Sequence, residues 1–138
     1  MDIEVVSHPL KQDTDSVLDG IKEYNAPHFP DQDLIPLSVF VRDSQNEVIA
    51  GLNAELFTTS LMINHLWVSS DLRGNDVGTK LIAKAESEAL ARGVTDIYLD
   101  TYSFQALGFY QKLGFKVVGE FSDYPIKGVH KHFLQKSL

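Results

Sequence analysis

The fold is decided by one stretch of the chain, which reads Leu66-Trp67-Val68-Ser69-Ser70-Asp71-Leu72-Arg73-Gly74-Asn75-Asp76-Val77-Gly78-Thr79-Lys80-Leu81. An apolar strand end leads through a short polar loop directly into a helix. Free backbone N–H groups and the positive end of the helix dipole then converge on one spot, which suits a phosphate or pyrophosphate. Gly74 and Gly78 allow close approach to the backbone, and Arg73 and Lys80 add positive charge. By spacing alone, an ordinary strand-to-helix connection explains the stretch equally well.

Downstream of this loop the pattern alternates between helix and strand, which predicts a βαβ unit. Gly93 and Gly114 each follow a predicted helix, at the position where a left-handed residue commonly ends one. The predicted helices are residues 77–92 and 106–113, and the predicted strands are residues 97–102, 115–121 and 130–135.

Upstream of the loop the pattern is that of an antiparallel meander. Residues 48–57 alternate between apolar and partly polar positions, typical of a strand with one buried face. Strands are also expected at 37–42 and 61–68, with a turn at 43–46. The result is a mixed α/β fold, whose sheet is antiparallel in its first half and has at least one parallel crossover in its second.

The first third of the chain gives weaker signals. Residues 3–6 are apolar and β-branched, which favours a strand. A cluster of helix-capping residues at 13–15 precedes apolar residues at helical spacing, so an amphipathic helix should begin there. Residues 25–36 contain Pro27, Pro30 and Pro36, which indicates a loop-rich segment.

Length and charge narrow the function. The 138 residues are near the size of one domain, so residues 1–138 are expected to form a single core. A net charge of −7 disfavours non-specific nucleic-acid binding, because phosphate backbones are repelled. No apolar run suits a signal peptide or a membrane span, so neither membrane nor nucleic acid is an expected partner. The chain has no cysteine, which suits the cytoplasm and excludes a cysteine nucleophile.

Two motifs resemble those of the Gcn5-related N-acetyltransferase (GNAT) superfamily. Arg73 and Gly78 match the Arg/Gln-x-x-Gly-x-Gly/Ala pattern that follows a strand in this family, whereas Asp76 replaces its middle glycine. Residues 103–115 look like the family's second signature, Asn-x-x-Ala-x-x-Phe/Leu-Tyr-x-x-x-Gly-Phe, with Ser103 in place of the asparagine. The ending from residue 119 to 125 is similar to that of small bacterial members.

The resemblance implies a GNAT-like, mostly antiparallel central sheet of about six to seven strands flanked by helices. It also implies that backbone amides of the loop bind the pyrophosphate of acetyl-coenzyme A, without a metal. Asp76 is expected to cap the following helix, since aspartate is a good cap. The expected cofactor-binding residues are Leu66, Trp67, Val68, Arg73, Gly74, Asn75, Asp76, Val77, Gly78, Thr79, Ser103, Ala106 and Phe109.

Acid and base roles are assigned by the same resemblance. Tyr110 matches the tyrosine that many members direct at the coenzyme A sulfur, so it is the expected general acid; aromatic packing is the alternative. Glu55 is the expected base, directly or through water, although a solvated carboxylate explains it equally well. His65 should point to the other side of its strand by alternation. The expected substrate-binding residues are His28, Phe29, Asn64, Asp100 and Tyr124.

These features together predict a cytoplasmic N-acetyltransferase that moves an acetyl group from acetyl-coenzyme A to a primary amine of a small molecule or peptide. Direct attack in a ternary complex is expected, because no cysteine can carry an acetyl intermediate. The alternatives are a catalytically silent acyl-coenzyme A sensor or a protein-interaction module on the same fold. The acceptor, the acyl-chain length and the oligomeric state stay open, a homodimer being one option.

Overall fold

The computed structural model of the chain describes residues 1–29 and 31–138. Pro30, one of the prolines in the predicted loop-rich segment, lies outside these residues. The chain divides into two compact units, residues 1–33 and residues 34–138, and each is described by itself. The prediction of one domain over residues 1–138 therefore stays a prediction.

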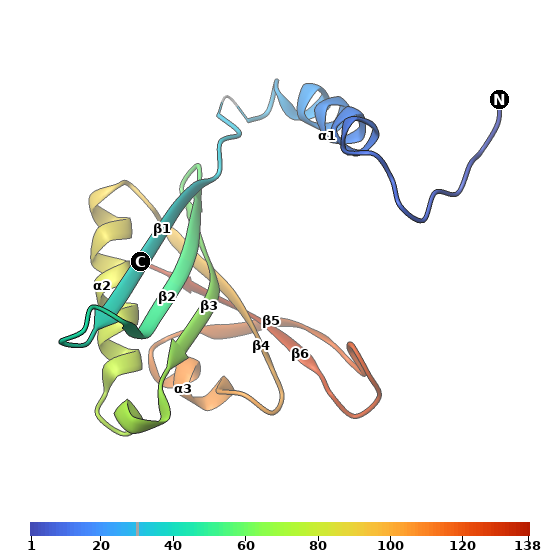
Figure 1. Cartoon of the computed structure of the whole chain (residues 1–138). Helices are drawn as coiled ribbons and strands as arrows, with labels where there is room; N and C mark the ends of the chain where they lie inside the picture. The colour runs from blue at the N-terminus through green and yellow to red at the C-terminus, as the bar shows by residue number, and fades with distance from the viewer. Residues whose placement is uncertain (30) are drawn as a thin grey trace. The chain divides into compact units, whose positions relative to one another are not determined.

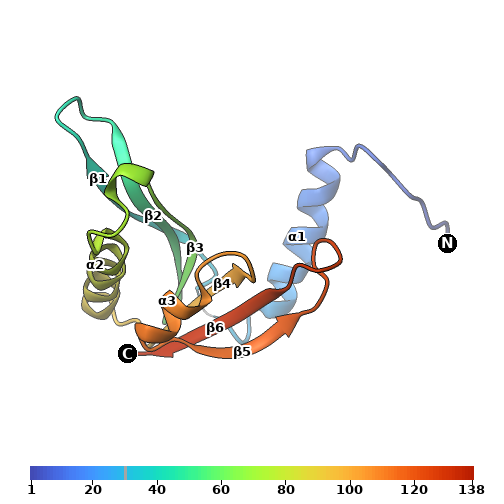
Figure 2. The ribbon, with the colours of Figure 1, turned by 90° about the horizontal axis from the view of Figure 1, so that it is seen from below.

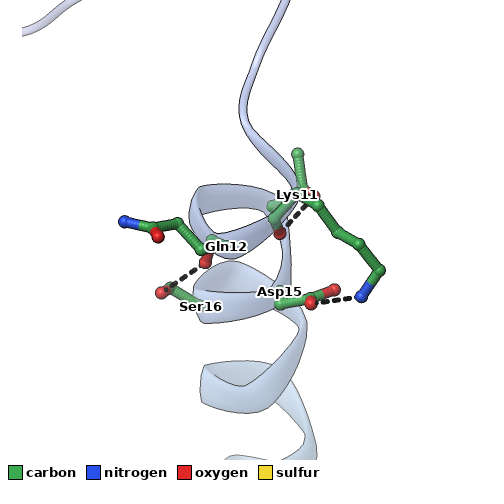
Figure 3. A network of polar contacts seen from close by, with 5 residues as sticks. Lys11, Gln12, Asp15 and Ser16 are labelled. Atoms are coloured by element: carbon green, nitrogen blue, oxygen red, sulfur yellow. Dashed lines mark hydrogen bonds and ion pairs between the residues drawn. The ribbon is translucent and has the colours of Figure 1, made fainter.

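The first unit contains one helix, α1 (Lys11–Asn25). Its N-cap is Leu10 rather than a residue of the 13–15 cluster, so the predicted start is wrong by a few residues. The polar side chains of that cluster lie inside the first turns instead, where Asp15 pairs with Lys11 at 2.6 Å (Figure 3). Such i, i+4 pairs stabilise a helix without marking its first residue.

The strand predicted at residues 3–6 does not form. Residues 1–10 belong to no helix or strand, and no strand of the described chain pairs with them. A β-branched composition favours extended backbone, but a strand exists only where a neighbouring backbone completes its hydrogen bonds. The sequence carries no information about that neighbour.

The second unit is built on a six-stranded sheet in the order β1-β2-β3-β4-β6-β5. Neighbouring strands are antiparallel except β3 and β4, which are parallel. This arrangement confirms the mixed, mostly antiparallel fold class, although the insertion of β6 between β4 and β5 was not predicted. The strands are β1 (Ile35–Arg42), β2 (Val48–Phe57), β3 (Ser60–Val68), β4 (Asp96–Tyr102), β5 (Lys116–Phe121) and β6 (Lys131–Ser137).

Two α-helices lie on one face of this sheet. The first, α2 (Val77–Ala91), joins the parallel strands β3 and β4 and runs alongside β1–β3 (Figure 2). The second, α3 (Leu107–Lys112), contributes to the same apolar core. A short 3₁₀ turn, η1 (Ser70–Leu72), precedes α2. The predicted βαβ unit is thereby confirmed.

Strand β2 shows why the core lies between the sheet and these helices. Its residues Ala50, Leu52, Ala54 and Leu56 are buried, whereas the side chains between them are not. Side chains of a strand alternate between its two faces, so one face is apolar and packs on α2 while the other faces away from the core. From α2, the buried residues are Leu81, Ile82, Ala85 and Ala89. Among the described residues, no helix is long and apolar enough to cross a membrane.

Candidate active site

The site begins where β3 and β4 separate. Their parallel pairing ends at Ile63 opposite Leu99, although both strands continue beyond this pair. Figure 1 shows the two strands side by side at one end of the sheet and diverging toward the other. The last residues of β3 therefore form no ladder pairs with β4, and a wedge opens between the two neighbouring strands.

A bulge in β3 lies at the start of this wedge. Ala54 of β2 pairs with Ile63, but the preceding residue Asn53 pairs with His65, so Asn64 is an extra residue. A bulge bends its strand and increases the local twist. The bulge also reverses which side chains of β3 point to the core. Ile63 is buried before the bulge, and Leu66 packs against the core after it.

A cleft of about 930 Å³ fills the wedge. Its walls come from the splayed strands, from the loop before α2 and from α3 with the turn before it. The lining residues are Ile63, Asn64, His65, Leu66, Trp67, Val68, Leu72, Arg73, Gly74, Asp76, Val77, Gly78, Thr79, Leu99, Asp100, Thr101, Tyr102, Phe104, Gln105, Ala106, Phe109 and Tyr110.

The N-terminus of α2 gives this cleft its anion-binding character. The first backbone bond at this end of the helix runs from Lys80 N–H to the carbonyl of Asp76 at 3.0 Å. The amides of Val77, Gly78 and Thr79 precede that bond and have no acceptor within the helix. All three residues line the cleft. The geometry thus offers several N–H donors and the positive end of a helix dipole to one ligand.

Arg73 holds the loop before α2 against the end of β3. Its Nε donates a hydrogen bond of 3.2 Å to the carbonyl of Val68, and both residues line the cleft. Gly74 follows with φ +84°, a left-handed conformation that side chains other than those of glycine, asparagine and aspartate rarely adopt. The loop is thereby fixed at both of these points.

Gly78 has a packing role that the sequence did not reveal. A Cβ added there would lie 3.2 Å from Cζ of Phe109 in α3, which is closer than ordinary van der Waals contact. The absence of a side chain lets the first turn of α2 approach α3, and the cleft lies against this junction.

Asp76 occupies the N-cap position of α2, as predicted, but does not cap the helix with its side chain. Its backbone is left-handed, with φ 59° and ψ 21°, whereas a capping residue is usually extended. The expected capping hydrogen bond is therefore wrong. The conformation explains why the family pattern has a glycine here: the position requires a positive φ.

Tyr110 of α3 lines the cleft and is otherwise almost buried, at 8% exposed. Burial, reinforced by the negative charge of Asp100, raises the pKa of its phenol above the usual value of 10.0. Tyr110 therefore keeps its proton at neutral pH. It also packs edge-on against Phe109 and Phe115, so the predicted packing role and a proton-donor role are compatible in one residue.

The expectation that His65 points to the other side of its strand is wrong. The extra residue Asn64 turns the following side chain over, so His65 is exposed and lines the cleft. Its Nδ1 lies 3.5 Å from Nδ2 of Asn53. Glu55 does not line the cleft, and its Oε1 accepts a hydrogen bond of 3.2 Å from Asn64, which does.

Most of the predicted cofactor residues are brought together at the cleft, but two are not. The side chain of Asn75 donates to the carbonyl of Leu72 at 3.3 Å. The hydroxyl of Ser103 accepts a hydrogen bond from His130 N–H at 3.1 Å, which ties it to the segment before β6. Both side chains thus hold the backbone around the cleft rather than line it.

The predicted substrate residues are divided. Asn64 and Asp100 line the cleft, and Tyr124 belongs to an aromatic cluster near β6 rather than to the lining. His28 and Phe29 belong to the first unit, so their role stays a prediction.

Sequence reasoning missed two cleft residues in the turn after β4, Phe104 and Gln105. Tyr102 and Phe104 stack in parallel, with ring centroids 5.7 Å apart. Gln105 fixes this turn, because its Oε1 accepts hydrogen bonds from Tyr102 N–H at 2.7 Å and from the Thr101 hydroxyl at 3.2 Å. The clustering of aromatic residues between a strand and a helix was the available signal.

Known proteins share this architecture. A blasticidin-S acetyltransferase of Streptomyces morookaense is 35% identical over 107 residues, covering 75% of this chain and 78% of that protein. The crystal structure of an acetyltransferase from Bacillus cereus is similar with a TM-score of 0.88 and 28% identity, covering 98% of both chains. An aminoglycoside 6′-N-acetyltransferase solved with coenzyme A has the same fold at 23% identity, with a TM-score of 0.67 over 89% of this chain and 80% of that chain.

The family model for the acetyltransferase (GNAT) family matches residues 8–115, which include the loop before α2 and the motif around α3. The match confirms the resemblance inferred from Arg73, Gly78 and the 103–115 segment. With its sheet, its splayed strands and its amide-lined cleft, the chain belongs to the GNAT acetyltransferase family.

Proposed function

We propose that the protein transfers the acetyl group of acetyl-coenzyme A to a primary amine by direct attack. The observation that carries this proposal is the single cleft in which the open edge of β3, the first-turn amides of α2 and Tyr110 meet. The amides suit the pyrophosphate, and the pantetheine arm would extend along the open edge of β3, which lines the same cleft. The structural relative solved with coenzyme A supports this choice of donor.

The reaction needs one bond formed and one broken. The amine nitrogen attacks the thioester carbonyl carbon, and the carbon–sulfur bond of the acetyl group then breaks. A backbone N–H of β3 within residues 66–68 would stabilise the negative charge on the carbonyl oxygen. The leaving thiolate takes a proton from the hydroxyl of Tyr110, which the raised pKa keeps protonated, and the proton that the attacking nitrogen loses as the amide forms returns to the phenolate.

The acceptor amine must first lose a proton, since such amines are mostly charged near neutral pH. His65 lines the cleft at the start of the wedge and carries an imidazole, the usual side chain for this task. We propose that His65 is the base that accepts this proton. Glu55, predicted as the base directly or through water, accepts a hydrogen bond from Asn64, and its role stays a prediction.

Removing the Tyr110 hydroxyl tests the acid role. Tyr110→Phe should lower kcat by about 10²–10⁴-fold, the range for loss of a general acid, and should leave the affinity for acetyl-coenzyme A nearly unchanged. Tyr98→Phe is the matched control, because Tyr98 lies outside the cleft and its hydroxyl accepts a hydrogen bond of 3.3 Å from Gln135. Coenzyme A release and calorimetry measure the two quantities. Unchanged turnover in Tyr110→Phe removes this residue from the mechanism.

The kinetic order tests direct attack. The chain has no cysteine, so initial velocities at several concentrations of both substrates should give intersecting double-reciprocal lines. Parallel lines would contradict the ternary complex. Tight binding of acetyl-coenzyme A without thiol release over a broad panel of amines would favour the sensor alternative.

A further inference from the structure

The side of β4 and β6 that faces away from the helices carries charged and aromatic groups in a fixed pattern. Asp100 lies directly opposite Phe133, and Tyr102 lies opposite Lys131. The neighbouring residue Leu134 is buried in the core, so this set lies on the other face of the sheet. Of the set, Asp100 and Tyr102 also line the cleft.

One cation site on this face is already filled by the chain itself. The Nζ atom of Lys131 lies 5.8 Å, 5.2 Å and 5.6 Å from the ring centroids of Tyr102, Tyr124 and Phe133. It also lies 3.7 Å from Oδ1 of Asp100, and its side chain is only 20% exposed. Three ring faces and a carboxylate hold this ammonium group. The Asp100 carboxylate can then bridge Lys131 and one further cation, whereas a second added positive charge would be repelled.

Asp100 retains access to the cleft beside this filled site. Its side chain is 41% exposed, and it lies one residue past the last pair of β3 and β4, where the wedge opens. Its charge reaches Tyr110, whose pKa it helps to raise. Asp96 shares this face of β4 and is held by Thr95, Gln135 and Ser137, and Glu55 on the neighbouring strands is bound to Asn64. Of these carboxylates only Asp100 lines the cleft, so it is the one that an acceptor can reach there.

The cleft also offers an open ring surface next to Asp100. Phe104 stacks on Tyr102 with an angle of 4° between the ring planes, and both residues line the cleft. Phe104 is 72% exposed, so its outer face is free to receive a further ring. Stacked aromatic pairs contribute about 0.5–1.5 kcal/mol beyond their buried area, or about twofold to tenfold in affinity.

We propose that the acceptor is a primary amine with a single positive charge and an aromatic ring, whose ammonium group pairs with Asp100 while its ring stacks on Phe104. This inference rests on the proposed function, since it specifies the amine. Lys131 sets the specificity: it holds Asp100 in place and excludes acceptors that carry a second cation.

The test compares four acceptors in a coenzyme A release assay: 2-phenylethylamine, propylamine, spermidine and phenylalanine. For the wild-type chain, kcat/KM for 2-phenylethylamine should exceed that for propylamine by about tenfold, the upper value for one aromatic stack. It should also exceed the values for spermidine, which carries additional positive charges, and for phenylalanine, whose carboxylate Asp100 repels. Binding of acetyl-coenzyme A is measured separately by calorimetry. Failure to bind acetyl-coenzyme A refutes the proposed function. Binding followed by preference for another acceptor, or by no turnover of 2-phenylethylamine, refutes this inference alone.

Variants separate the roles. Asp100→Asn should lower kcat/KM for 2-phenylethylamine by about tenfold to a hundredfold, the range for a lost charge-assisted hydrogen bond, mainly through KM. Phe104→Ala should slow 2-phenylethylamine but not propylamine, which a merely structural role would not do. Lys131→Met should raise the rate with spermidine relative to 2-phenylethylamine. Glu88→Gln removes an exposed charge of α2 and serves as the control.

Two results of the variant series contradict the assignment. If Phe104→Ala slows propylamine as much as 2-phenylethylamine, the ring does not stack on the acceptor. If Lys131→Met leaves the ratio of spermidine to 2-phenylethylamine unchanged, Lys131 does not set the charge of the acceptor. Urea unfolding of each variant shows whether it is folded under the assay conditions.

Discussion

Asp76 combines a strained backbone with a charge in the cleft. Its left-handed φ of 59° disfavours most side chains, although aspartate tolerates it better than others do. Its carboxylate makes no capping hydrogen bond to the helix, and the residue lines the cleft. This residue therefore affects both the stability of the fold and the binding of the cofactor.

Two substitutions separate these effects. Asp76→Gly should raise the free energy of unfolding by about 1 kcal/mol, because glycine adopts positive φ without a Cβ penalty. Asp76→Asn keeps a side chain and removes only the charge. Both should tighten acetyl-coenzyme A binding by about fivefold, the effect of removing about 1 kcal/mol of charge repulsion. Urea unfolding and calorimetry measure these changes. Equal affinity in all three proteins would show that the carboxylate turns away from the cofactor.

At the scale of elements, the bulge in β3 decides what the cleft contains. Strand alternation is a sound rule for β2, whose even-numbered residues from Ala50 to Leu56 are buried. It fails in β3 because one extra residue, Asn64, reverses the faces of all residues after it. Nothing local in the sequence marks this bulge, since it depends on the pairing with β2. The position of His65 could not be predicted for that reason.

The contact between α2 and α3 gives a test at the same scale. Gly78→Ala should lower the free energy of unfolding by about 1 kcal/mol or more, because the new methyl group would press on Phe109. Gly108→Ala is the matched control, since nothing lies within 4 Å of the added Cβ. In α3 that change should stabilise the protein by about 0.5–1 kcal/mol, the helix preference of alanine over glycine. Equal effects in urea unfolding would contradict the close packing at Gly78.

At the scale of the whole second unit, Asp96 ties the C-terminal strand to the middle of the sheet. Its carboxylate accepts hydrogen bonds from Ser137 at 2.6 Å, Thr95 at 2.8 Å and Gln135 at 3.2 Å. These bonds, the one from Ser137 foremost, hold the pKa of Asp96 below its usual value of 3.8. Residues 39 and 41 positions away in the sequence are thus joined by one side chain.

The lowered pKa gives this contact a pH dependence of defined sign. In acid the unfolded chain binds the proton of Asp96 more readily than the folded chain, so the contribution to stability is present above pH 3.8 and is lost as pH falls through the lowered value. Asp96→Asn should therefore reduce stability at pH 7 and weaken its decline in acid. Urea unfolding at pH 7 and pH 3 measures both, with Asp71→Asn as an exposed control. An unchanged decline in acid would exclude this role.

The sequence by itself determined the local order of the second unit. The alternation in residues 48–57, the loop at Arg73–Gly78 and the glycines at 93 and 114 predicted strand, turn and helix ends correctly, because short-range sterics and apolar periodicity decide these features. The family followed from two motifs, each a contiguous stretch of the chain, which is why both can be recognised in the sequence.

Only the tertiary structure decided which of these residues meet. The insertion of β6 beside β4, the splay of β3 from β4 and the bulge at Asn64 all depend on pairing between distant segments. Such pairing places His65, Asp100 and the Tyr102–Phe104 stack in one cleft. Residues 3–6 show the opposite case: their composition favours extended backbone, but no other described segment pairs with them and they form no strand. Long-range hydrogen bonds are shared between two segments, so neither segment alone specifies them.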